Sequence, residues 1–329
     1  MSNTLDELQK YNINQKDIQK LKDIGINSIQ GLYMTSRKNL LNIKGFNEKK
    51  IKNIFNEANK IEVYGLFQKG STLMNERDNN IFKISTTSKN IDNILGGGIE
   101  SSSLTEIIGE RNTGKTDFVH ILCVSAQKIN PSNKIIFIDF DKTFISKKVI
   151  GFAKALNVKK KKVADNILLI NDIDNYEQLI KKLDEITEKI HKGEYCLLIV
   201  ESLISLFQKY FEEKMNNNSQ SNIFEIKFDI ESKLGQILIK LKNMALLFNI
   251  AVIISRRINI NNDSDEHANN YDLINYDQNI EIILGNECQT RFKLKRIKNG
   301  KIKCLLLNSP MMPEKDCKII INEKGIVDC

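Results

Sequence analysis

The sequence predicts an α/β protein with a mostly parallel sheet and an antiparallel extension at its end, preceded by a small all-helical domain. From residue 82 onward, apolar runs rich in Ile, Leu and Val alternate with segments of helical spacing, as in a parallel sheet covered on both faces. Near the end, two strand patterns flank Asn299-Gly300, a strong hairpin-turn signal. Within residues 5–60, apolar positions follow helical spacing.

A glycine turn between two helix patterns characterises the N-terminal domain, residues 1–62. Gly45 stands within 41–51, with apolar residues before and after it, which is the spacing of a helix-hairpin-helix. Glycine permits the tight turn, and amides at the start of the next helix can receive a DNA phosphate. The lysines that would add positive charge are Lys44, Lys49 and Lys50. The alternative is an αα-hairpin that only packs or contacts protein.

A change in pattern indicates where the second domain begins. Residues 63–81 contain several Gly and Asn and show little periodicity, so we expect a linker there and a core over 82–329. The expected strands span 104–108, 134–139, 196–201 and 250–255, and the expected helices span 115–127, 176–190 and 231–248. Strand patterns at 291–295 and 301–308 form the antiparallel extension.

The segment from Gly109 to Thr116 reads GERNTGKT and lies between an expected strand and an expected helix. This is the pattern of a phosphate loop, in which glycines let the backbone wrap around a nucleotide and donate amides to its phosphates. Lys115 would neutralise phosphate charge, and Thr116 would ligate Mg²⁺. The residues predicted to bind ATP are Gly109, Glu110, Arg111, Asn112, Thr113, Gly114, Lys115 and Thr116.

Two other expected strands end in carboxylates. A phosphate loop requires a carboxylate at the end of a neighbouring strand to hold Mg²⁺ through water, and Glu201 ends the strand 196–201. Strand 134–139 is followed by Asp141, our candidate for orienting or deprotonating the attacking water. The predicted catalytic residues are therefore Asp141, Glu201 and Lys115. The alternative is that these acidic residues only fringe the sheet.

Composition and net charge exclude few classes of function. The net charge is +8, with Lys interspersed among Asn and Ile, which fits a polyanion partner but equally fits a base-composition bias in the gene. No run approaches the roughly eighteen apolar residues of a membrane-spanning helix, and the start lacks a signal peptide's apolar core. The six cysteines show neither paired nor zinc spacing, so we expect free thiols in a reducing compartment.

Further motifs extend along nearly the whole chain. They read ISTTSKNID at 84–92, LGGGIES at 95–101, HILCVSAQ at 120–127 and SPMMPE at 309–314. Together with the phosphate loop, these motifs resemble those of the eukaryotic RecA-family strand-exchange recombinases, and of the meiosis-specific members most of all. The resemblance implies that the phosphate loop belongs to a RecA-like core and that the N-terminal helix-hairpin-helix contacts duplex DNA.

The same resemblance implies a function, partners and further sites. Such a protein binds ATP and Mg²⁺, self-associates into a filament or ring on single-stranded DNA, pairs it with double-stranded DNA, and works in the nucleus with recombination mediator proteins and no membrane. Two DNA-gripping loops would fall at 209–224 and 258–279. The residues implied are Lys209, Lys214, Arg256 and Arg257 for DNA, Lys148 for the nucleotide, and Phe67 and Gly70 for docking onto the next protomer.

Departures from the family pattern concentrate at the chemistry. The family has Glu at Asp141 and Asp at Glu201, and its Asn-Gln pair is replaced by Arg256 and Arg257. Arginine can neutralise a terminal phosphate or bind DNA, but it cannot accept a hydrogen bond as Gln does. An ordinary salt-bridged pair of arginines is the alternative. The first loop is Asn-rich, so we expect it to be flexible.

Three hypotheses follow. The leading one is a DNA-dependent ATPase that acts as a meiotic recombinase in strand exchange and double-strand break repair. The second is an ATP-binding paralogue with little or no hydrolysis, acting as an accessory filament component; the changes at Asp141, Glu201 and Arg257 favour it. The third is an unrelated phosphate-loop motor or kinase, which the N-terminal domain disfavours.

Overall fold

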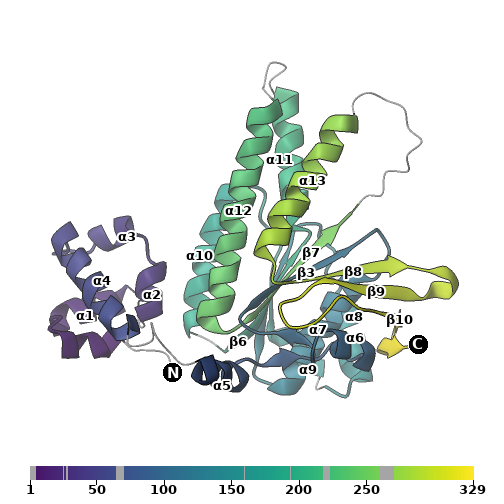
Figure 1. Ribbon diagram of the computed structural model, residues 1–329, viewed down its shortest axis with the longest axis horizontal. Helices are drawn as coiled ribbons and strands as arrows, with labels where there is room; N and C mark the ends of the chain where they lie inside the picture. Colours follow the sequence, from purple (N-terminus) through teal and green to yellow (C-terminus); the bar gives the residue numbers. More distant parts are fainter. Residues whose placement is uncertain are drawn as a thin grey trace. The chain divides into compact units, whose positions relative to one another are not determined.

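The computed structural model describes residues 5–24, 26, 29–63, 70–158, 160–192, 194–217, 223–258 and 270–329. The chain divides into two compact units, Met1–Asn80 and Ile81–Cys329 (Figure 1). The division falls at the end of the segment expected to be a linker, close to the predicted start of the core. Each unit is described by itself below.

The first unit is all-helical. Its elements are η1 (Leu5–Tyr11), α1 (Gln15–Asp23), α2 (Ile29–Met34), α3 (Arg37–Leu41), α4 (Glu48–Val63) and α5 (Gly70–Asn80). Leu5, Leu8 and Leu21 are completely buried in one apolar cluster. The side chains of Asn14 and Ser36 cap α1 and α3 by accepting hydrogen bonds from backbone amides. Within the segment expected to be a linker, residues 70–80 form a helix despite weak amphipathic patterning.

The second unit is built on a nine-stranded sheet. Its strands run in the order β11-β10-β9-β8-β3-β7-β6-β4-β5. The six parallel strands are β3 (Ser103–Gly109), β4 (Lys134–Asp139), β5 (Ile167–Ile170), β6 (Tyr195–Glu201), β7 (Ala251–Arg257) and β8 (Thr290–Arg296). The antiparallel extension consists of β9 (Ile302–Asn308), β10 (Asp316–Asn322) and β11 (Gly325–Asp328). The short strands β1 (Lys83–Ile84) and β2 (Ile99–Glu100) pair separately. This α/β architecture with an antiparallel end confirms the predicted fold class.

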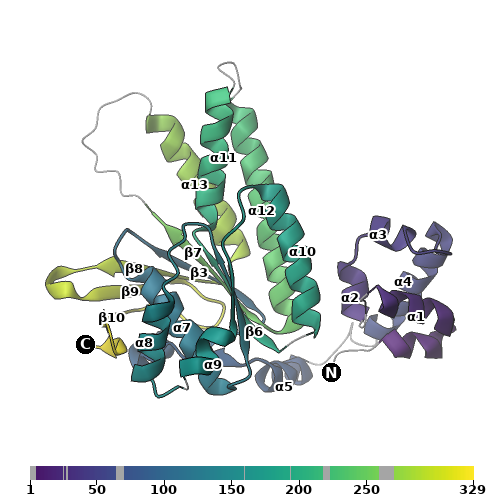
Figure 2. The same ribbon diagram turned by 180° about the vertical axis from the view of Figure 1, so that it is seen from behind.

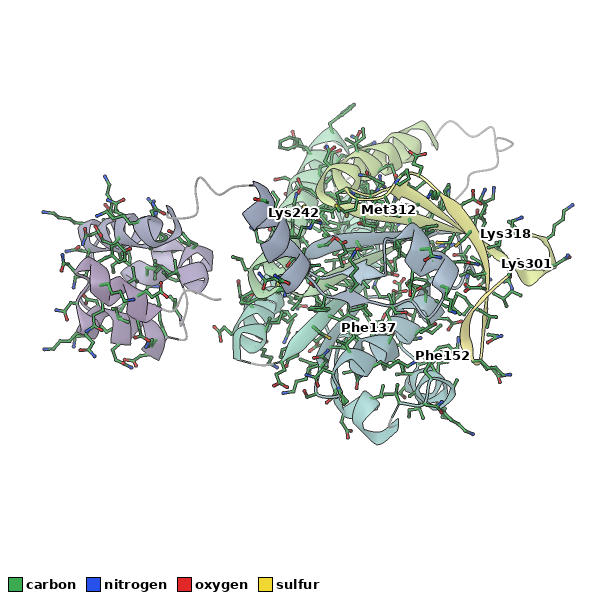
Figure 3. The ribbon with its side chains drawn as sticks, turned by 60° about the horizontal axis from the view of Figure 1, so that its bottom comes forward. Phe137, Phe152, Lys242, Lys301, Met312 and Lys318 are labelled. Atoms are coloured by element: carbon green, nitrogen blue, oxygen red, sulfur yellow. The ribbon has the colours of Figure 1, made fainter. Side chains whose placement is uncertain are left out.

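Helices cover both faces of the sheet, because its central strands are apolar on both sides. One face is covered by α6 (Lys89–Ile94), α7 (Lys115–Ile129), α8 (Ser146–Ala155) and α9 (Lys160–Asp165) (Figures 1 and 2). The other is covered by α10 (Tyr176–Lys192), α11 (Leu203–Asn217), α12 (Ile223–Phe248) and α13 (Asn270–Glu287). A single turn of helix, η2 (Lys298–Gly300), joins β8 to β9. Phe137 on β4 lies inside the core (Figure 3). No described helix is long and apolar enough to cross a membrane.

In the two segments expected to be DNA loops, the residues that the structure describes are mostly helical. The first, 209–224, is taken up mainly by the end of α11 and the start of α12, and 218–222 lie outside the described residues. In the second, 270–279 belong to α13, while 259–269 lie outside the described residues. Helical spacing of buried Leu203, Leu206 and Phe207 continues the amphipathic pattern from the sheet edge into α11. The expectation of a flexible, Asn-rich loop is therefore wrong for residues 212–217, which are helical, and the rest of that run, 218–222, lies outside the described residues.

We predict that Leu21→Ala weakens the N-terminal unit. Leu21 is completely buried in its apolar cluster, so truncation should lower the free energy of unfolding of this unit by about 2–5 kcal/mol. Hydrogen exchange of peptides from residues 5–63 in the full chain would measure the change. Lys52→Ala, at an exposed position of α4, is the matched control and should leave protection unchanged. Equal protection in the Leu21 variant would contradict the packing described above.

Candidate functional site

The phosphate loop crosses from the end of β3 to the first turn of α7. Asn112 and Gly114 both adopt left-handed backbone conformations, with φ of 62° and 86°. A methyl group on Gly114 would lie 2.7 Å from Ile321 Cδ1, and one on Gly109 would lie 2.7 Å from the Leu294 carbonyl oxygen. Backbone conformation and close packing therefore both require glycine at position 114, and packing alone requires it at 109.

Lys115 lies over the loop at the start of α7. Its Nζ donates to the carbonyl oxygens of Gly109 at 2.8 Å and Glu110 at 2.7 Å. Burial lowers the pKa of Lys115 to about 8; the negative charge of Glu201 opposes this effect and the positive charge of Arg257 adds to it. A bound phosphate would add negative charge beside the ammonium and oppose the effect of burial. Thr113 stabilises the loop by donating to the Glu110 carbonyl, whereas the side chain of Arg111 is exposed.

A buried carboxylate joins the loop to the centre of the sheet. Glu201, at the end of β6, is 2% exposed. It accepts hydrogen bonds from the Thr116 hydroxyl at 3.0 Å and the Ser255 hydroxyl at 2.6 Å. Burial raises the pKa of Glu201 above its ordinary value, although both hydroxyls and Lys115 favour the charged form and Asp139 disfavours it. The sequence predicted the placement of Glu201 beside Thr116 but not the contact with Ser255.

These oxygen atoms suit a magnesium ion. Mg²⁺ in nucleotide sites is held by a hydroxyl or carboxylate, water and phosphate rather than by a complete protein cage. Thr116 and Glu201 provide such a pair, and the described residues contain no group of three or more His, Cys, Asp or Glu side chains arranged to hold a metal ion. The donor set thus fits a Mg²⁺ ion shared with a bound nucleotide.

The two acidic residues that follow β4 have different environments. Asp139 is 1% exposed and accepts hydrogen bonds from the Phe144 amide at 2.7 Å and the Thr143 hydroxyl at 3.3 Å, which fix the following turn. Asp141 is exposed and lines a cavity of about 330 Å³. The other residues that line this cavity are Ser202, Ile204, Ser205, Gln208, Arg256 and Arg257. Of the two acids, Asp141 is the one open to a reacting water.

The two arginines at the end of β7 also differ. Arg256 is 4% exposed, and its Nε donates to Glu106 Oε1 at 2.8 Å while its Nη2 contacts Glu281. Arg291 completes the cluster, with Nε 2.7 Å from Glu106 Oε2 and Nη2 2.5 Å from Glu281 Oε1. The structure therefore places Arg256 in a buried ion-pair cluster rather than where a DNA contact was expected. Arg257 is exposed and lies at the cavity beside Asp141.

The ion-pair cluster was missed by sequence reasoning. Glu106 lies within an apolar strand, and its partners come from β7, β8 and α13, so their proximity depends on sheet order and register. The one sequence signal for this cluster was Glu106 itself, a carboxylate within an apolar strand of the kind that is buried on both faces. Burial opposes ionisation of Glu281, but Arg256 and Arg291 outweigh it and lower the pKa of this carboxyl. The cluster holds α13 against the ends of β7 and β8.

Lys148 lies beside a second, larger cavity at the first turn of α7. Its Nζ is 2.6 Å from Asp117 Oδ1. The cavity, of about 820 Å³, is lined by both residues, by Phe152 of α8 and by Ile321 of β10. Since Ile321 also contacts the position of Gly114, this cavity adjoins the phosphate loop. The predicted nucleotide residue Lys148 is therefore brought close to the loop residues.

The residues predicted for DNA in the N-terminal unit cluster on its hairpin. Gly45 takes φ of 90° between α3 and α4, as the turn requires. The Lys44 carbonyl accepts a hydrogen bond from Lys20 Nζ at 2.8 Å, Lys50 Nζ is 3.1 Å from Asp17 Oδ1, and Lys49 is exposed. Lys20 was not predicted.

The remaining predicted residues lie elsewhere. Lys209 and Lys214 are exposed on α11, so they are helical rather than in a loop as expected. Gly70 is the first residue of α5, and Phe67 lies outside the described residues.

We predict that Glu201→Gln stabilises the nucleotide-free protein at neutral pH. Folding raises the pKa of the Glu201 carboxyl group. Below the pKa of the unfolded chain the group is protonated in both states and costs no stability. As the pH rises from there through the folded-state pKa, ionisation favours the unfolded chain and the free energy of unfolding falls. The amide removes this cost and can still hydrogen-bond to Thr116 and Ser255. Thermal melts should show a higher midpoint for the variant at pH 7, with the gap closing in acid. Asp141→Asn, at an exposed acid, should leave the midpoint unchanged; a lower midpoint for Glu201→Gln at pH 7 would contradict the account.

Comparisons with known proteins agree with this fold. A family model described as Rad51 matches residues 77–329. The meiotic recombination proteins called DMC1/LIM15 homolog of Mus musculus and Homo sapiens are each 34% identical to the chain, over 98% of it and 92% of their own length. The meiotic recombination protein DLH1 of Candida albicans is 32% identical over 99% of the chain and 97% of its own length. The resemblance to meiosis-specific RecA-type recombinases is thereby confirmed, and the chain belongs to the Rad51 family.

Proposed function

We propose that this chain is an ATP-dependent recombinase that assembles on single-stranded DNA in the nucleus and exchanges strands during meiotic recombination and double-strand break repair. The observation that carries the proposal is the placement of Glu201 between Thr116 of the phosphate loop and Ser255 of the central strand β7. Relatives that match the chain over almost their full lengths are named meiotic recombination proteins. That likeness favours the recombinase over an accessory paralogue without hydrolysis, and it disfavours an unrelated motor or kinase.

The nucleotide would occupy the phosphate loop with its charge facing Lys115. Thr116 and Glu201 would hold Mg²⁺, which offsets the charge of the phosphates. Asp141 is the exposed acid of the 330 Å³ cavity and would orient the attacking water, and Arg257, at the same cavity, would contact the terminal phosphate. The nucleoside would enter the cavity beside Lys148. Proteins of the Rad51 family are generally DNA-dependent ATPases, and this set of groups would supply the roles that such chemistry needs.

DNA would bind to both units. In the N-terminal unit, exposed Lys49 and the left-handed Gly45 lie at the start of α4, where backbone amides can receive a phosphate. In the core, Lys209 and Lys214 on α11 offer charge for the DNA backbone. We leave Arg256 out of this DNA surface because its charge is already paired inside the core.

Self-association would use the free edge of the sheet. Strand β5 ends the strand order, so one side of its backbone has no partner strand among the residues that the structure describes. Beside it lies a cavity of about 200 Å³ lined by Leu169, Ile186 and Lys189, among others. A segment of a second copy could add to this edge and place an apolar side chain in the cavity.

Lys115→Ala should abolish ATP hydrolysis stimulated by single-stranded DNA. The variant lacks the ammonium group that donates to the carbonyl oxygens of Gly109 and Glu110. Its rate of ATP hydrolysis should therefore fall by about a hundredfold or more. Phosphate release with and without DNA measures it, and Lys128→Ala, at an exposed position of the same helix, is the control. Undiminished stimulation in Lys115→Ala would contradict the proposed site. Nucleotide binding without turnover in the unchanged protein would support the accessory alternative instead.

Leu169→Asp should weaken self-association. Leu169 is 37% exposed on β5, so a charge there should repel an apolar partner segment without disturbing the core. Sedimentation with ATP and single-stranded DNA should show smaller assemblies than for the unchanged protein. Leu246→Asp, on an exposed apolar position of α12, is the control and should assemble normally. Equal assembly of the two variants would show that the β5 edge is not an interface.

A further inference from the structure

Two cysteines face each other on neighbouring strands of the antiparallel extension. Cys304 of β9 and Cys317 of β10 are direct partners in the register. Cys304 is completely buried, and Cys317 is partly buried against the same apolar core. Because directly opposite residues of antiparallel strands project to the same side of the sheet, the two thiols lie together on its inner face.

The strand geometry brings the two residues within reach of a covalent bond. The Leu306 amide donates to the Lys315 carbonyl at 2.8 Å, which makes 306 and 315 a hydrogen-bonded pair. Hydrogen-bonded pairs alternate along an antiparallel ladder, so Cys304 and Cys317 form the next one, with Cα atoms about 5.5 Å apart. Disulfides span Cα separations of about 4.4–6.8 Å. The Cα separation therefore suits a disulfide, while the Cβ atoms of a hydrogen-bonded pair, about 5.5 Å apart, must approach to the roughly 3.5–4.5 Å of a disulfide.

The environments of the thiols give them different roles. The Cys304 thiol hydrogen-bonds to the Cys317 sulfur, which lowers the pKa of Cys317, although burial and the nearby Asp328 and Asp316 oppose the effect. The same hydrogen bond and burial raise the pKa of Cys304. The thiolate, which is the form that oxidants attack, is thus favoured at the more accessible Cys317. Lys318, the next residue, marks this position on β10 in Figure 3.

The other buried thiols lack these properties. Burial raises the pKa of Cys196 to about 12, and it raises the pKa of Cys123 and of Cys288 as well. Cys329 is exposed, at the end of the chain. Cys304 and Cys317 thus combine direct pairing, partial access and one thiol poised to react.

We propose that Cys304 and Cys317 form an oxidation site that closes to a reversible intramolecular disulfide on reaction with hydrogen peroxide. In the first step the Cys317 thiolate attacks peroxide, the O–O bond breaks, and a sulfenic acid forms while hydroxide leaves and takes up a proton as water. In the second step the Cys304 sulfur attacks Cys317, the S–O bond breaks, and a second water leaves with the Cys304 proton. Two thiols and one peroxide thereby give one disulfide and two waters.

The bond would tie together the strands that pack behind the phosphate loop. Ile302 of β9 and Ile321 of β10 both lie against Gly114, where an added methyl group would come within 3.3 Å and 2.7 Å of them. Cross-linking the strands restricts the unfolded chain. We therefore expect the oxidised protein to unfold at a higher temperature than the reduced protein. This inference is independent of the proposed recombinase function.

The test uses the full chain carrying Cys329→Ser, which removes the exposed terminal thiol. The protein is treated with an equivalent of hydrogen peroxide, blocked with iodoacetamide, digested and analysed by mass spectrometry. The proposal predicts a linked pair of peptides containing residues 304 and 317, lighter by two hydrogen atoms than the reduced pair and separated again by dithiothreitol. The unfolding midpoint should rise on oxidation and return on reduction.

Two variants keep the test decisive. The Cys304→Ser chain should fold, and its Cys317 should be oxidised to a sulfenic acid that dimedone traps. In Cys317→Ser no cross-link should form, and Cys304 should stay a free thiol that iodoacetamide alkylates after the peroxide treatment. The proposal is overturned if Cys317 passes to sulfinic acid as fast in the parent as in Cys304→Ser. It is also overturned if both cysteines remain fully alkylated after peroxide treatment, or if the linked peptides contain another cysteine.

Discussion

The hydrogen bonds from Thr116 and Ser255 to the buried Glu201 carboxylate are the contacts on which the candidate site depends. They connect the start of α7, the end of β6 and the end of β7, which are brought together by parallel pairing of β3, β7 and β6. A carboxylate so enclosed is costly to ionise. A cation bound there would offset this cost, which is why the proposed Mg²⁺ site includes Glu201.

Two departures from the family pattern acquire a physical reason in this arrangement. The longer side chain of Glu201 reaches both hydroxyls from its strand end, and the shorter Asp141 remains at an open cavity instead of folding back as Asp139 does. The two adjacent arginines, Arg256 and Arg257, have different environments. Arg256 is neutralised by Glu106 and Glu281 inside the protein, and Arg257 keeps its charge at the cavity. The ion-pair cluster thereby secures α13 while leaving one arginine at the proposed reaction site.

The fold and the phosphate loop could be predicted because their signals are local. The GERNTGKT spacing, the apolar strand ending in Glu201 and the Asn299-Gly300 turn each lie within a few residues. What sequence reasoning missed depends on distant partners: Glu106 meets Arg256 and Arg291 only through sheet register, and Cys304 meets Cys317 in the same way. The extended α11 and α12 were missed because polar, Asn-rich composition outweighed helical spacing in the prediction. The assignments of DNA contacts stay predictions.

The most direct test of the central claim is a calorimetric titration of ATP with and without Mg²⁺, at neutral and mildly acidic pH. If Glu201 is the carboxylate that holds Mg²⁺, the gain in ATP affinity on adding Mg²⁺ should be large at neutral pH. It should shrink as the pH falls toward the raised pKa of this group, and the corresponding Glu201→Gln protein should show a smaller gain at neutral pH and only the pH dependence that protonation of ATP itself causes. An equal gain from Mg²⁺ in the two proteins at every pH would contradict the account.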